Sequence, residues 1–247
     1  MESIGCCLTQ RRISLSAKGQ VRTIQKRNVG SGGHKWLTNR RNPDHIKNAA
    51  ATFKFYGYLT NGDAPIQGLY PKPLAQSARE LGIPNPSTLL PHCIVLVATH
   101  PAITQSFLEE LHLFDKDGKQ SGFAWTDGGF HLVGQKHRRG PTRSQKIILL
   151  TDVTTEVVRQ IIVLTQPLRD YLRVRNDSGW RYLLLSGKKG FGYPVPMKSL
   201  SRILNSPRMV RSLSVRLGAT SQLSLEQRLE LATRFSLTSL RASAGVL

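Results

Sequence analysis

The sequence has few cysteines, few acidic residues and no long apolar run. Its three cysteines, Cys6, Cys7 and Cys93, fit neither a disulfide framework nor a Cys-x-x-Cys metal site, so we expect reduced thiols in an intracellular protein. The longest apolar stretch is CIVLVA at 93–98, which is far shorter than the roughly 18 residues of a membrane span. The first fifty residues also lack the apolar region of a secretory signal. These absences argue against secreted and membrane-spanning classes of protein.

The scarcity of acidic residues leaves a large positive charge. The 247 residues include 35 Lys and Arg and 15 Asp and Glu, a net charge of +20. Residues 1–50 hold ten cations and two acids, residues 51–185 hold fifteen and eleven, and residues 186–247 hold ten and two. A polyanion relieves the self-repulsion of such a chain, so nucleic acid is the expected partner. A basic surface without a specific partner is the alternative.

Composition divides the chain into three segments. Residues 1–50 combine cations with the sequence VGSGGH and predict a basic, flexible N-terminal arm, with an organelle transit peptide as the alternative. Residues 51–69 form a connecting segment with a hairpin signal at Asn61-Gly62. Residues 70–247 are expected to form the folded domain.

The folded domain is predicted to be α+β and mainly helical, with helices packed around a small antiparallel sheet. Apolar spacing predicts helices over 73–82, 87–100 and 103–114, with Gly82 after the first and Ser87 or Thr88 as the N-cap of the second. Residues 122–150 predict two or three strands that turn at Asp127-Gly128. Further helices are predicted over 154–175, where Pro167 should impose a kink or break, over 197–204 and 224–235, and at the end of the chain.

Motifs for metals and cofactors are weak. DKDGK at 115–119 lacks the later ligands of a calcium loop, and the seven histidines show no zinc-binding pairing. The two-residue-spaced glycines Gly187 and Gly190 match an RNA-clamping loop, but a surface turn explains them better. We therefore predict neither a metal nor a cofactor.

The second predicted turn of the sheet carries the densest cationic cluster. Eleven residues contain no acid and five cations: Lys136, Arg138, Arg139, Arg143 and Lys146. A tight strand pair can align such side chains with a phosphate backbone. We interpret Arg138, Arg139, Arg143 and Lys146 as DNA-binding residues, the alternative being a solvated loop.

The order of elements over residues 70–247 resembles the catalytic domain of the tyrosine recombinases, the phage integrase family. In that family a Glu-Leu-rich helix, here SFLEELHLF, precedes a three-stranded sheet with a hairpin lysine, and a later helix opens with a His-x-x-Arg box. The resemblance implies that Lys136 is the catalytic lysine that protonates the leaving 5′ oxygen. It also implies that Arg241, in TSLRAS, stabilises charge on the scissile phosphate, a role that suits a planar guanidinium.

The sequence departs from the family pattern at three places. Thr104 stands at the position of the first-box arginine and Thr238 at that of the second-box histidine. The last tyrosine, Tyr193, precedes Arg241 and so cannot match the family's nucleophile.

The end of the sequence lies within a predicted helix. Leu240, Ala244 and Leu247 share one face of this helix, which further helices would cover. We therefore expect a C-terminally truncated recombinase, with a short docking tail as the alternative.

The resulting hypothesis is a DNA-binding, integrase-like protein of DNA recombination and integration that is catalytically incompetent on its own. Its expected partners are DNA and other recombinase subunits, with no membrane, and its expected location is the bacterial cytoplasm or nucleoid. The alternatives are a non-catalytic basic protein that binds RNA or DNA, and a non-functional gene product.

The clustered charge predicts salt-dependent binding to duplex DNA. Because each neutralised phosphate releases counterions, affinity should fall by on the order of a hundredfold between low and physiological ionic strength. Fluorescence anisotropy of a labelled duplex measures this fall. Binding that is insensitive to salt would contradict the prediction.

Overall fold

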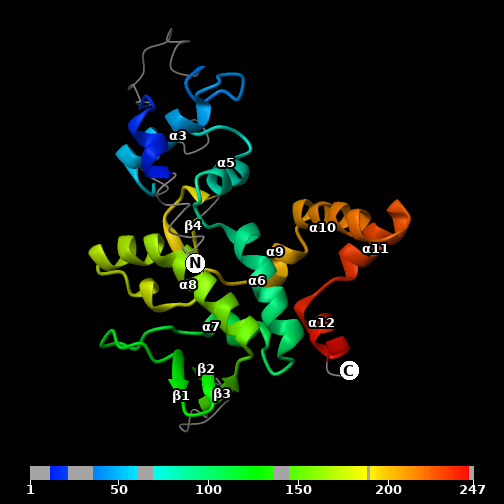
Figure 1. Cartoon of the computed structure of the whole chain (residues 1–247). Coiled ribbons are helices and arrows are strands. Elements are labelled where there is room, and N and C mark those ends of the chain that lie inside the picture. The colour runs from blue at the N-terminus through cyan, green and yellow to red at the C-terminus, as the bar shows by residue number, and fades with distance from the viewer. Residues whose placement is uncertain (1–11, 22–35, 60–68, 136–144, 188–189, 245–247) are drawn as a thin grey trace. The chain divides into compact units, whose positions relative to one another are not determined.

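The protein combines helices with two small antiparallel sheets (Figure 1). The computed structural model describes residues 12–21, 36–59, 69–135, 145–187 and 190–244. Within these ranges the predicted α+β mixture is confirmed. The hairpin signal at Asn61-Gly62 lies outside the described residues.

The chain divides into two compact units that do not follow the predicted segments. The first unit comprises residues up to Thr88, Arg159–Trp180 and Leu185–Pro196, and the second comprises Leu89–Val158, Arg181–Leu184 and Met197–Leu247. Helix α8, Asp152–Val174, supplies residues to both units. The chain passes between the units several times, a topology that composition along the sequence does not reveal.

The first unit contains α3, His45–Tyr56, and α5, Leu74–Glu80, with the strand pair β4, Leu185–Gly187, and β5, Pro194–Pro196. A helical segment at 12–17 and the first residues of α6, Pro86–Thr99, also belong to it. The boundary predicted at residue 50 falls inside α3. Ala49 and Ala50 are fully buried, and the Asn48 side chain donates to the Leu37 carbonyl (2.8 Å). This part of the predicted arm is therefore packed, because small apolar side chains and a buried amide anchor it.

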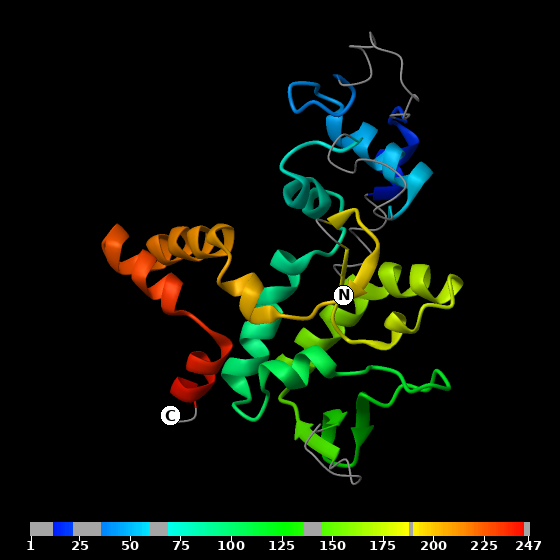
Figure 2. The same ribbon diagram turned by 180° about the vertical axis from the view of Figure 1, so that it is seen from behind.

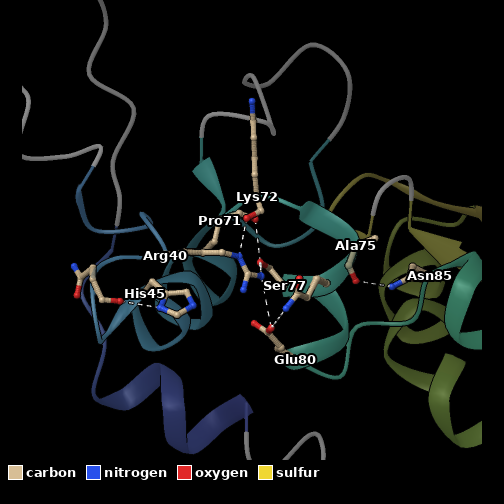
Figure 3. Close-up of polar contacts among 10 residues, drawn as sticks. Arg40, His45, Pro71, Lys72, Ala75, Ser77, Glu80 and Asn85 are labelled. Atoms are coloured by element: carbon tan, nitrogen blue, oxygen red, sulfur yellow. Dashed lines mark hydrogen bonds and ion pairs between the residues drawn. The ribbon is translucent and has the colours of Figure 1, made fainter. Parts of the chain in front are cut away.

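Arg40, also within the predicted arm, ties its segment to α5 (Figure 3). Its Nε donates to the Lys72 carbonyl at 2.6 Å, and its Nη2 lies 3.3 Å from Ser77 Oγ and 3.5 Å from Glu80 Oε1. Ser77 Oγ in turn donates to the Pro71 carbonyl at 2.9 Å. A cation that composition alone assigns to a partner surface thus binds acceptors within the protein.

The ends of α5 and α6 show how local signals set helix limits. Gly82 follows α5 with φ +65°, and its N–H and that of Ile83 donate to the Arg79 and Ala78 carbonyls, as in a Schellman motif. This confirms the predicted stop. The predicted cap of α6 is wrong, since Asn85 caps the helix: its Oδ1 accepts from Ser87 N at 3.0 Å.

Helix α8 runs continuously through Pro167, which excludes a break; of the predicted kink or break, the kink stays a prediction. The helix buries a fully enclosed arginine, Arg169, whose Nε donates to the Trp180 carbonyl at 3.0 Å. Its Nη1 lies 3.2 Å from Thr165 Oγ1 and 3.5 Å from the Ile162 carbonyl. Burial lowers the pKa of Arg169 to about 10. These acceptors join α8 to the 3-10 turn at Ser178–Arg181.

The second unit contains a three-stranded antiparallel sheet in the order β1, β2, β3. Strands β1, Phe123–Thr126, and β2, Gly129–Gln135, meet at Asp127-Gly128, which confirms that turn. Strand β3, Gln145–Leu149, pairs with β2, and one face of the sheet buries Phe123, Leu132 and Ile148 in register.

Five helices complete the second unit with the remainder of α6 and the start of α8. They are α7, Gln105–Glu110; α9, Leu200–Leu204; α10, Pro207–Thr220; α11, Leu225–Arg234; and α12, Leu237–Ala244. Helix α10 was not predicted. Helix α7 is shorter than expected, because Leu111 is extended and the Leu113 N–H donates to the Arg181 carbonyl at 2.7 Å.

The buried position of Arg169 predicts a stability difference between two arginines of α8. Arg169→Met should lower the free energy of unfolding by about 2 kcal/mol, because the Trp180 carbonyl loses a charged donor. Arg173→Met is the matched control: Arg173 is exposed and stacks on the Trp180 ring at 4.3 Å, worth about 1 kcal/mol or less. Urea unfolding measures both. Equal losses would contradict a structural role for Arg169.

Candidate nucleic-acid interface

An open pocket of about 280 Å³ lies between α7 and α12 in the second unit. Hydroxyl groups, one carboxylate and one guanidinium line it. The lining residues are Thr104, Gln105, Ser106, Glu109, Leu237, Thr238 and Arg241.

Thr104 reaches the pocket because it begins α7. Its backbone is extended, and its Oγ1 accepts from the Phe107 N–H at 3.1 Å, as an N-cap does. The Ser106 hydroxyl lies 3.1 Å from the same oxygen. The cap therefore places two hydroxyl groups at the pocket, on the first turn of the helix.

Helix α12 forms the other side of the pocket. Ser236 and Ser239 cap it reciprocally, each backbone N–H donating to the other's Oγ at 3.0–3.1 Å, and Leu237 is buried. This anchors the first turn. Thr238 and Arg241 are three residues apart, so they lie on the same side of the helix.

The single carboxylate of the pocket, Glu109, accepts hydrogen bonds from groups other than Arg241. Its Oε1 accepts from the Leu200 N–H at the start of α9 (2.7 Å) and from Gln105 Nε2 (2.7 Å). Arg241 is half-buried and forms no ion pair with any residue that the structure describes. The guanidinium donors of Arg241 thus remain for an external anion.

Of the predicted DNA-binding hairpin, Lys136, Arg138, Arg139 and Arg143 lie outside the described residues. The strand leading to them packs on α7: a Cβ at Gly134 would lie 2.4 Å from Phe107 Cε2, so only glycine allows this approach. The described base of the hairpin thus adjoins the helix that lines the pocket.

Lys146, predicted to bind DNA, contacts its own unit. Its ammonium donates to the Ala102 carbonyl and lies 5.9 Å from the centroid of the Phe107 ring. Ala102 is two residues before Thr104, so the contact links β3 to the segment that enters the pocket. Lys146 is half-buried. Its contacts are those of a residue that positions the segment before Thr104 against β3.

Sequence reasoning singled out Thr104, Thr238 and Arg241, which line one pocket, but missed its three other polar residues. Gln105, Ser106 and Glu109 belong to α7, and the Thr-x-x-Phe start of that helix is the signal that could have found them. Tyr193 lies in the first unit, where its Oη donates to Asp177 Oδ2 at 2.7 Å. This hydrogen bond raises the pKa of Tyr193, which disfavours its phenolate form.

Comparison with known proteins identifies no relative: no protein-family model, curated protein or solved structure matches this chain. Within the described ranges, no helix is long and apolar enough to cross a membrane. No group of three or more His, Cys, Asp or Glu among these residues could hold a metal ion. The function has to be inferred from the charge and from the pocket.

The turn before Thr104 depends on a histidine whose pKa is shifted. His100 Nε2 lies 2.8 Å from Thr154 Oγ1, and the His100 carbonyl accepts from the Ile103 N–H at 2.8 Å. Burial lowers the pKa of His100 from its ordinary 6.5. The neutral imidazole is therefore the form that the fold favours.

This shift predicts that acid destabilises the second unit. Between the folded-state pKa of His100 and 6.5, the unfolded chain binds more protons than the folded chain. The contribution of neutral His100 to stability is therefore complete above pH 6.5, and it is lost as the pH falls through the folded-state pKa. Urea midpoints measured from about pH 7.5 to about pH 5 should show the decline. His100→Gln should flatten it. An unchanged slope in that variant would contradict the assignment.

Proposed function

We propose that the chain is a DNA-binding protein of the site-specific recombinase type, and that its pocket receives a backbone phosphate of duplex DNA. Arg241 is the anion ligand. The hydroxyl groups of Thr104, Ser106 and Thr238 are the neutral donors.

One observation carries the proposal: Thr104, Thr238 and Arg241, from two helices far apart in the sequence, line the same pocket. They are the residues that stand at the first arginine, the histidine and the second arginine of the recombinase boxes. The resemblance that selected them uses order and spacing only, so their convergence supports it from an independent source.

The electrostatics of the pocket support an anionic ligand. A guanidinium offers a planar fork to two phosphate oxygens, and Glu109 is directed to Leu200 and Gln105. The net charge of +20 draws a polyanion to the surface as a whole.

The proposed activity is DNA binding, with recombination and integration as the process that the resemblance implies. Threonine at positions 104 and 238 can donate hydrogen bonds, but it has neither the permanent charge of arginine nor the titration range of histidine. The role of Lys136 as proton donor is implied by the resemblance alone and is not part of the proposal. Because threonine stands at positions 104 and 238, strand cleavage lies outside the proposal.

The second candidate is a non-catalytic protein that binds RNA or DNA through charge alone. The concentration of cations in residues 1–50 and 186–247 favours it. It differs from the first candidate in giving Arg241 no special weight among the arginines.

Substitution of Arg241 separates the two candidates. Arg241→Ala should weaken binding of a labelled DNA duplex about tenfold to a hundredfold, since it removes charge-assisted hydrogen bonds to phosphate. Arg241→Lys should be intermediate, because the ammonium keeps the charge without the fork. Fluorescence anisotropy at fixed salt measures each variant.

Arg234→Ala is the matched control for Arg241→Ala. Arg234 is exposed and pairs with Glu230 at 2.9 Å, so its removal deletes the same charge outside the pocket. Its expected effect is about threefold or less. Equal losses for both variants would contradict the pocket and favour charge-only binding.

A further inference from the structure

Helices α10 and α11 of the second unit pack together, side by side in both views (Figures 1 and 2), but differ in charge. Helix α10 contains three arginines, Arg208, Arg211 and Arg216, and no acid. Helix α11 contains two arginines and two glutamates. The positive charge of the pair therefore belongs to α10.

The arginines of α10 are exposed and lack internal partners. Within the described part of the chain, none of the three forms an ion pair or a side-chain hydrogen bond. The arginines of α11 are engaged: Arg234 pairs with Glu230, and Arg228 Nε donates to the Ser224 carbonyl at 3.3 Å. The arginines of α11 thus have partners within the protein, whereas those of the adjacent α10 have none among the described residues.

The helix pair is built to hold α10 in place. Ser206 caps α10 by accepting from the Met209 N–H, and Ser224 forms a capping box with Gln227 at the start of α11. The buried residues of the two helices, Ser214 and Ala232, are small, which permits close packing. A well-defined helix loses little conformational entropy when it meets a partner.

The exposed face of α10 has the dimensions of a groove-binding element. Arg208, Arg211 and Val215 follow one another at i, i+3 and i+7, so they share a side, and Val215 is 72% exposed. The 14 residues of α10 span about 21 Å, with a diameter of about 10–12 Å. The B-DNA major groove, about 12 Å wide, admits such a helix.

We propose that α10 lies in the major groove of duplex DNA, with Arg208, Arg211 and Arg216 on phosphates and Val215 against the groove floor. The inference rests on the proposed function and adds a second contact surface to it. DNA is favoured over duplex RNA because the A-form major groove is too narrow for side chains to read.

The test compares two double variants that remove the same charge from the same helix pair. Arg208→Gln/Arg211→Gln should lower the slope of log affinity against log salt by about 1.8, or about 0.9 for each lost phosphate contact. Arg228→Gln/Arg234→Gln on α11 should leave the slope almost unchanged. Circular dichroism and thermal unfolding establish that each variant is folded. Arg208→Lys/Arg211→Lys retains the charges and should keep the slope.

The outcomes distinguish this inference from the proposed function. If the wild-type protein fails to bind duplex DNA at low salt, the proposed function fails. If it binds and both double variants reduce the slope equally, α10 is not the contact and the inference alone is overturned. Two further results overturn it: equal affinity for duplex RNA, or an unchanged slope with loss of self-association in sedimentation. The latter would show that the face of α10 that carries Arg208 and Arg211 joins two copies of the chain.

Discussion

The excess of positive charge is the constraint that every part of this fold has to satisfy. Each arginine or lysine needs solvent, a carboxylate or a set of carbonyl and hydroxyl oxygens. Arg40 takes a carbonyl, a hydroxyl and a carboxylate; Arg169 is buried against carbonyls and a hydroxyl; Lys146 donates to the Ala102 carbonyl. With only 15 acids in the chain, backbone oxygens replace carboxylates as partners.

Among the residues that the structure describes, several cations have no such oxygens, and four of these carry the two proposals. Arg241 lines a pocket whose carboxylate is held by other donors, and Arg208, Arg211 and Arg216 project from a helix without acids. Both groups lie in the second unit. The distinction between engaged and available cations is a property of the folded chain, and net charge does not contain it.

Local signals predicted local structure well, whereas pairing between distant segments escaped them. The Asp127-Gly128 turn and the Gly82 stop depend on neighbouring residues, and both are present. Along the stripe from Ile103 to Phe114, Ile103, Phe107 and Leu111 are buried as a helical pattern requires, yet the helix ends at Glu110. Segment 181–183 accepts and donates backbone hydrogen bonds there.

Helix α10 was missed because arginines and serines interrupt its apolar period. For the site, spacing found the three residues at motif positions, while Glu109 depends on the distant Leu200 N–H, which no spacing reveals.

The internal contacts of Arg40 have a kinetic consequence. A guanidinium whose Nε and Nη2 already face Lys72, Ser77 and Glu80 leaves Nη1 to bind a phosphate. Paired cations offer a partner few new hydrogen bonds, but the chain's uncompensated charge still contributes to the long-range potential that steers a polyanion toward the protein. For the DNA complex proposed above, the rate of encounter should therefore follow the net charge of the entire chain. Its lifetime should follow the side chains whose donors are unoccupied.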